Sequence, residues 1–138
     1  MSVLIDTGVF YAHQNRSSSR HRPAKESLTT VLKGKYGEPY TTDYVYDEAV
    51  TLALRRTGEF SESMEISDRI LNRDWISLEH VSKNDFEQGV EIFEKYSDQD
   101  LSFTDAVTVA VMRERSIDRV LSFDTDFDGI VERLEPSY

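Results

Sequence analysis

The stretch Val3-Leu4-Ile5-Asp6-Thr7-Gly8 opens the 138-residue chain with a short apolar run that ends at an aspartate. A second run of the same kind, Val120-Leu121-Ser122-Phe123-Asp124, lies near the other end of the chain. Short apolar runs bounded by turn-forming residues predict buried strands, so we expect strand 3–5 to be followed by a turn. If both strands are central and parallel, Asp6 and Asp124 lie at the same edge of the sheet.

Helices and further short strands are expected to alternate between these two runs. The alternation predicts an α/β fold with a mainly parallel sheet, right-handed crossovers and helices on both faces. The expected helices cover residues 23–34, 42–58, 61–71, 82–93 and 102–115, and the remaining expected strands cover 40–42, 75–78 and, as a last edge strand, 130–134.

Length and composition predict one domain over residues 1–138, large enough to bury a core. The chain has no cysteine, which excludes a disulfide framework and a thiol nucleophile. No stretch has the length and apolar character of a membrane span. We therefore expect a soluble, cytoplasmic protein that does not bind a membrane.

Acidic residues outnumber basic ones by 26 to 16, which gives a formal net charge of −10. This charge opposes loose binding to a polyanion such as nucleic acid, although salt screens charges that are spread over a surface. Local charge then matters more than the total. Basic side chains do cluster along the chain, either as a binding surface or as two solvated helix faces: Arg16, Arg20, His21, Arg22 and Lys25, and later Arg55 and Arg56.

Two further acids are expected at the edge that holds Asp6 and Asp124. Glu48 and Asp105 lie near the starts of predicted helices, and helices that follow strands begin at this same edge. Each acid alone is explained by a helix cap, an Asx turn or a solvated helix position. Four carboxylates together would repel one another and would need a cation. Oxygen ligands without histidine or cysteine suit Mg²⁺ or Mn²⁺, and phosphodiester cleavage is the reaction that such a site favours.

Three short motifs resemble those of PIN-domain ribonucleases, the family that includes the VapC toxins of toxin–antitoxin pairs. Ile5-Asp6-Thr7-Gly8-Val9-Phe10 resembles the opening Asp-Thr/Ser-x-x-Phe/Leu motif, and Leu101-Ser102-Phe103-Thr104-Asp105-Ala106 resembles Leu-Ser/Thr-x-x-Asp-Ala. Ser122-Phe123-Asp124-Thr125-Asp126-Phe127 is similar to Thr-x-Asp-x-Asp/His-Phe, with serine where threonine is commoner. Glu48 occupies the place of the family's helix glutamate, and the likeness covers nearly the whole chain.

The resemblance implies a three-layer α/β/α fold with about five strands and an endoribonuclease that uses Mg²⁺ or Mn²⁺. It also implies an RNA substrate, a homodimer and an antitoxin protein as partner. Asp6, Glu48, Asp105 and Asp124 are then the catalytic, metal-facing residues, and Asp126 is a further metal ligand.

Three alternatives remain open at this point. Residues 124–135 match the calcium-loop pattern D-x-D-x-[DN]-G-x₅-E, although the expected strand before them is wrong for an EF-hand. A phosphoacceptor receiver domain also clusters acids at strand ends, but the expected strand 75–78 ends in Glu79-His80 rather than an aspartate. The third alternative is a non-catalytic subunit that keeps the fold and acts by binding RNA or protein.

Overall fold

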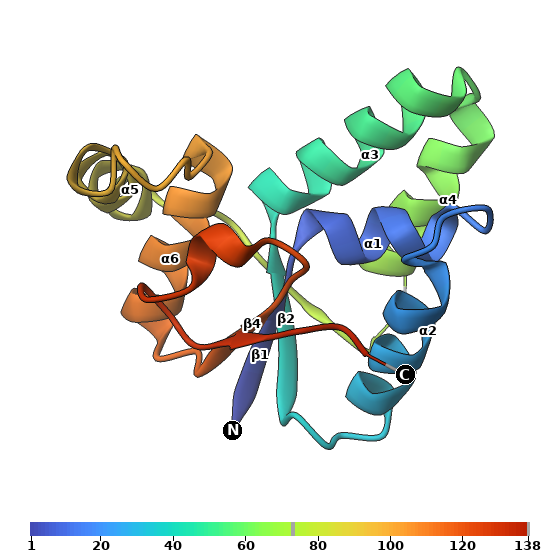
Figure 1. Cartoon of the computed structure of the whole chain (residues 1–138), viewed down its shortest axis with the longest axis horizontal. Helices are drawn as coiled ribbons and strands as arrows, with labels where there is room; N and C mark the ends of the chain where they lie inside the picture. Colours follow the sequence, from blue (N-terminus) through green and yellow to red (C-terminus); the bar gives the residue numbers. More distant parts are fainter. Residues whose placement is uncertain (73, 138) are drawn as a thin grey trace.

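Five parallel strands form one sheet in the computed structural model of the chain, which describes residues 1–72 and 74–137 (Figure 1). The strand order is β3-β2-β1-β4-β5, and every neighbouring pair is parallel. The first strand is therefore central and has β4 directly beside it, which meets the condition for Asp6 and Asp124 to share one edge. The strands are β1 (Ser2–Ile5), β2 (Glu38–Thr42), β3 (Ser77–Glu79), β4 (Arg119–Leu121) and β5 (Arg133–Leu134).

Helices cover both faces of this sheet, which confirms the predicted three-layer α/β/α fold (Figure 1). Alternate side chains of β1 enter two separate cores: Val3 and Ile5 lie in one, and Leu4 lies in the other. The first core is closed by α1 (Thr7–Gln14), α2 (His21–Leu32), α3 (Asp43–Thr57) and α4 (Phe60–Leu71), and the second by α5 (Lys83–Lys95) and α6 (Phe103–Arg115).

Local capping signals place the helix ends close to the predicted positions. Thr42 caps α3, because its hydroxyl oxygen accepts a hydrogen bond of 3.0 Å from the amide of Val45. The same helix ends at Gly58, whose φ of 70° suits glycine. Reciprocal side-chain and backbone hydrogen bonds form capping boxes at Ser82 of α5 and Ser102 of α6.

Two segments near the acids differ from the prediction. The expected turn after strand 3–5 is wrong, because helix α1 begins at Thr7 and buries Val9 and Phe10 in the first core. The predicted strand 120–123 is two residues too long at its end. The strand β4 stops at Leu121, since the amide of Asp124 donates to the hydroxyl of Ser122 instead of to a neighbouring strand.

Both edge strands are also displaced from their predicted positions. β3 runs over Ser77–Glu79 rather than 75–78, and β5 contains only Arg133 and Leu134 of the predicted 130–134. Neither strand borders β1, so these shifts leave the centre of the sheet unchanged. Within the described part of the chain, no helix has the length and apolar character needed to cross a membrane.

Candidate functional site

The five acids singled out in the sequence line one cavity of about 530 Å³ at the carboxyl ends of β1 and β4. We call it the acid cavity. Each acid reaches it from a different position in the fold, and helix starts and connecting loops bring them together. The acids are Asp6 after β1, Glu48 on α3, Asp105 in the first turn of α6, and Asp124 and Asp126 after β4.

Asp6 is held at the centre of the sheet with one carboxylate oxygen left unpaired. Its amide donates to the carbonyl of Leu121 at 3.1 Å, which ties the end of β1 to β4. The hydroxyl of Ser122 donates to Oδ2 of Asp6 at 2.6 Å. Its other oxygen, Oδ1, is buried and has no hydrogen-bond partner among the described residues. Since buried polar atoms are normally satisfied, this oxygen points to an absent partner.

Asp105 combines a structural contact with a place in the acid cavity. The amide of Ser102 donates to Oδ2 of Asp105 at 3.3 Å, and the amide of Asp105 donates back to the Ser102 hydroxyl at 3.0 Å. The predicted helix-cap role is thus correct. It uses one carboxylate oxygen, so the cap does not exclude a second role in the cavity that Asp105 lines.

Asp124 and Asp126 reach the acid cavity through a turn of 3₁₀ helix, η1 (Thr125–Phe127). Oδ1 of Asp124 accepts a hydrogen bond of 2.9 Å from the amide of Asp126, which confirms the expected Asx-type turn. The amide of Asp124 donates at 2.9 Å to the same Ser122 hydroxyl that contacts Asp6. Ser122 therefore connects two acids that come from the ends of neighbouring strands.

Burial and mutual repulsion make this site costly to ionise. Burial raises the pKa of Asp6 to about 6, with further upward contributions from the charges of Glu48 and Asp124, while the hydrogen bond from Ser122 opposes the rise. Burial raises the pKa of Asp105 to about 8, and the charges of Asp6 and Asp124 raise it further. A cation in the cavity would relieve both effects.

The residues of the acid cavity fit a hydrated divalent cation. Among residues 1–72 and 74–137, no three carboxylate or imidazole groups come close enough to form a closed set of ligands. Mg²⁺ does not need such a set, because it keeps several waters and binds through one or two carboxylates. The unpaired Oδ1 of Asp6 and the raised pKa of Asp105 fit the chemistry of such a site.

Further residues that the sequence analysis did not assign to the site also line the acid cavity, and one of them, Asp100, is a sixth acid. Thr7 has a buried hydroxyl with no partner in the described part of the chain, and Ser122 is fully buried. Arg20 lies over the ring of Phe123, 4.9 Å from its centre. The adjacency of Ser122 to the Asp124 motif was the available signal for Ser122. For Arg20 the only available signal was its membership of a basic cluster.

The structure does not favour the two alternatives that depend on other acids. Before residues 124–135 it has a strand, and within them a 3₁₀ turn, so the two helices of an EF-hand are missing from this described segment. Asp128 and Glu135 both pair with Arg133. Glu79 ends the edge strand β3, two strands away from β1, which places it far from the position that a receiver domain requires.

Known proteins share this fold and sequence family. The family model for the PIN domain matches residues 3–132. The 23S rRNA-specific endonuclease VapC20 of Mycobacterium tuberculosis is 30% identical over 94% of this chain and 96% of its own length. A VapC ribonuclease of Archaeoglobus fulgidus is 25% identical over 92% of this chain and 80% of its own. The crystal structure of VapC20, described as a Sarcin-Ricin loop cleaving toxin, superposes with a TM-score of 0.83 at 29% identity, covering 94% of this chain and 97% of that one.

Proposed function

The chain belongs to the PIN-domain family, and from this premise we propose that it is a Mg²⁺- or Mn²⁺-dependent endoribonuclease that hydrolyses RNA phosphodiester bonds. The observation that carries the proposal is the buried, unpaired Oδ1 of Asp6 in a cavity lined by five further acids, the four named above and Asp100. Charge repulsion at this position has no structural benefit that we can identify. A bound cation would account for the repulsion, because it would compensate the charge of the carboxylates.

The proposed roles follow from where each side chain lies. Asp6 and Asp105 would hold the ion most directly, because both are almost fully buried and both have a raised pKa. Glu48, Asp124 and Asp126 would complete the site through bound waters. When bound, the ion would supply an activated water and stabilise charge on the phosphate. Ser122 orients Asp6 by holding its Oδ2, which keeps Oδ1 directed away from that hydrogen bond.

RNA is the proposed substrate because of what the similar proteins act on. VapC20 is described as specific for 23S rRNA, and the Archaeoglobus fulgidus relative is described as a ribonuclease. We propose that this chain likewise cuts RNA inside a strand, and ribosomal RNA is the first substrate to test. The alternative of a non-catalytic binding subunit predicts RNA or protein binding without cleavage.

We also propose that the protein is the toxin of a toxin–antitoxin pair, with an antitoxin protein as its partner and a homodimer as its own assembly. The toxin role, the antitoxin partner and the homodimer are supported by the family resemblance. The toxin role is also supported by the similar VapC20, which is described as a toxin. Growth arrest on expression, relieved by the product of a neighbouring gene, would support the toxin role. Light scattering after size-exclusion chromatography measures the oligomeric state.

The first experiment is cleavage of a mixed single-stranded RNA pool by the purified protein in EDTA, Mg²⁺ or Mn²⁺, beside an Asp6→Asn variant. We expect cleavage with either ion, none in EDTA, and none by the variant. Cleavage that persists in EDTA or in Asp6→Asn would reject the proposed site. Binding without any cleavage, across salt conditions, would support the binding-subunit alternative instead.

A further inference from the structure

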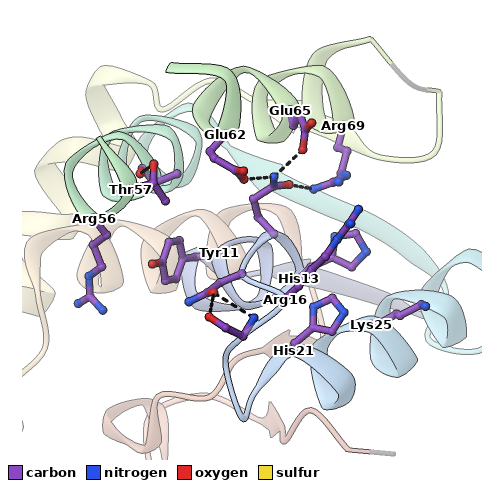
Figure 2. A pocket seen from close by; sticks show the side chains of 14 residues that line it. Tyr11, His13, Arg16, His21, Lys25, Arg56, Thr57, Glu62, Glu65 and Arg69 are labelled. Carbon is purple, nitrogen blue, oxygen red and sulfur yellow. Dashed lines mark hydrogen bonds between the residues drawn. The ribbon is translucent and has the colours of Figure 1, made fainter. Parts of the chain in front are cut away.

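A second cavity, of about 870 Å³, lies at the opposite end of α1 from the acid cavity (Figure 2). Side chains from α1, the loop after it, α2, α3 and α4 line its walls. It is larger than the acid cavity, and none of the five acids lines it. Because four of its lining side chains are cationic, we call it the basic cavity: Arg16, Lys25, Arg56 and Arg69.

Positive charge in the basic cavity is unevenly distributed over its walls. Its two carboxylates, Glu62 and Glu65, lie together on α4, and both accept hydrogen bonds from the side-chain amide of Gln14. Arg69, on the same helix, donates to the other end of Gln14. Figure 2 shows these groups joined on one side of the cavity, with Lys25 and Arg56 away from them.

Three of the cations remain available to a ligand. Arg16, Lys25 and Arg56 are exposed and form no ion pair with the carboxylates of the described residues. Arg56 lies over the ring of Tyr11, 5.6 Å from its centre, so its guanidinium is positioned without being neutralised. In a chain with a net charge of −10, such a local excess of unpaired cations is unusual.

His13 reports the positive potential inside the basic cavity. Burial lowers the pKa of His13 to about 4, and the charges of Arg69, His21, Lys25 and Arg16 lower it further. This imidazole is therefore neutral at pH 7 and does not add to the charge. An anion beside the same cations would experience the opposite effect and be stabilised.

Helices α1 and α3 each line both cavities. Helix α1 lines the acid cavity with its first residues, Thr7 and Gly8, and the basic cavity with Tyr11, His13 and Gln14, so the eight-residue helix spans about 12 Å between them. Helix α3 also lines both cavities: Leu52 lines the acid cavity, and Ala53 and Arg56 line the basic one. Figure 1 shows α1 lying alongside α3.

We propose that the basic cavity binds backbone phosphates of the RNA strand whose cleaved bond lies in the acid cavity, with Arg16, Lys25 and Arg56 as the phosphate contacts. The inference rests on the proposed function and adds the path of the substrate. Phosphates are the part of an RNA strand that unpaired lysine and arginine recognise regardless of sequence. The acidic surface elsewhere repels the strand and leaves this path as the favourable one.

The test is RNA binding by an Arg16→Gln/Arg56→Gln double variant in an Asp105→Asn background that cannot cut its ligand. The matched control is Arg55→Gln/Arg113→Gln, which removes the same charge from two exposed arginines that line neither cavity. Fluorescence anisotropy with labelled single-stranded RNA over a salt series gives Kd and its salt dependence. We expect the test variant to raise Kd about tenfold and to flatten the slope of log K against log salt by about 1.4, the value for two lost phosphate contacts on a single strand.

Three results would overturn the proposal. If the test and control variants bind RNA equally, while the unmodified protein still cuts RNA with Mg²⁺, the proposed function survives and the basic cavity is not on the RNA path. If the test variant keeps its RNA affinity but loses a co-purified protein partner, the cavity binds an acidic segment of that partner instead. If the unmodified protein neither binds nor cuts RNA, both proposals fail together.

Arg16→Glu should weaken RNA binding more than Arg16→Gln. Because the mutated cations are exposed, neither substitution should disturb the fold.

Discussion

Ser122 is the residue that connects the acids of the two central strands. Its hydroxyl donates to Oδ2 of Asp6 at 2.6 Å and accepts the amide of Asp124 at 2.9 Å. Burial raises the pKa of Asp6, and this hydrogen bond opposes the rise because it favours the ionised carboxylate. Because Ser122 acts through its hydrogen bond to Asp6, we regard it as a positioning residue.

Replacing Ser122 by alanine should raise the pKa of Asp6 further, since the opposing hydrogen bond is lost. Cleavage at neutral pH should fall by about 10- to 100-fold, the usual cost of losing a group that orients a metal ligand. The acid limb of the pH–rate profile should move to higher pH. Ser122→Thr keeps a hydroxyl and should restore both properties. An Ala variant with reduced activity but an unmoved profile would limit Ser122 to packing.

Asp105→Asn should abolish cleavage and yet stabilise the fold in the absence of metal. The asparagine oxygen can still accept from the amide of Ser102 and keep the capping box, while the repulsion from Asp6 and Asp124 disappears. We expect the free energy of unfolding in EDTA at pH 7 to rise by about 1–2 kcal/mol. Denaturant titration measures it, with the exposed Asp98→Asn as control. Cleavage at the wild-type rate would contradict the assignment of Asp105.

At the scale of secondary-structure elements, α5 and α6 approach closely at Gly89. A β-carbon built on Gly89 would lie 2.8 Å from Cγ2 of Val107 on α6. Glycine inside a helix normally costs about 0.5–1 kcal/mol relative to alanine, so it is retained here for the close contact. The contact matters for the site because α6 carries Asp105.

Gly89→Ala should therefore destabilise the protein, by about 1–3 kcal/mol as for other overpacked positions. The gain in helix propensity is smaller than the cost of moving Val107. A Gly89→Ala/Val107→Ala double variant should lose less stability than the sum of the two single changes, because the smaller side chain makes room. Thermal unfolding of the four proteins completes this cycle. If the stability losses of the two single variants simply add in the double variant, α5 and α6 move apart freely and the contact between Gly89 and Val107 does not limit stability.

Most elements could be predicted from the sequence because their ends carry local signals. Thr42 and Gly58 bound α3, and Ser102 with Asp105 begins α6. Helix α1 could not be predicted in this way. Asp6-Thr7-Gly8 has the composition of a turn, and the helix forms because Val9 and Phe10 gain burial in the first core. Tertiary packing therefore outweighs local propensity at this position.

The acids of the candidate site were predictable because they follow from strand ends and helix starts. Their shared cavity required only a parallel sheet with β1 beside β4. The orientation of Ser122 and the unpaired hydroxyl of Thr7 depend on side-chain geometry that no spacing encodes. The basic cavity is harder still, because its cations come from three helices and a loop that are separated in sequence.

At the scale of the whole molecule, stability and function place opposite demands on the same carboxylates. Asp6 and Asp105 have pKa values of about 6 and about 8 in the fold, against an ordinary 3.8, so the folded protein binds more protons than the unfolded chain between these values. Stability without metal therefore falls as pH rises. Two other groups respond differently. The pKa of His13 is lowered to about 4, so its neutral form adds stability as pH rises towards 6.5, and the lowered pKa of Asp85 matters only in acid.

The directions of these pKa shifts define a pH window in which the acids of the cavity dominate the pH dependence of stability. Above pH 6.5, His13 is mostly neutral in both states and Asp6 is mostly ionised, which leaves Asp105 as the main titrating group. In EDTA, the free energy of unfolding should fall by about 1 kcal/mol per pH unit from pH 6.5 to 8, and Asp105→Asn should remove that slope. Saturating Mg²⁺ should also flatten it, because the ion binds the ionised form, and Mg²⁺ affinity should weaken as pH falls. A metal affinity independent of pH would mean that the ion binds away from these carboxylates.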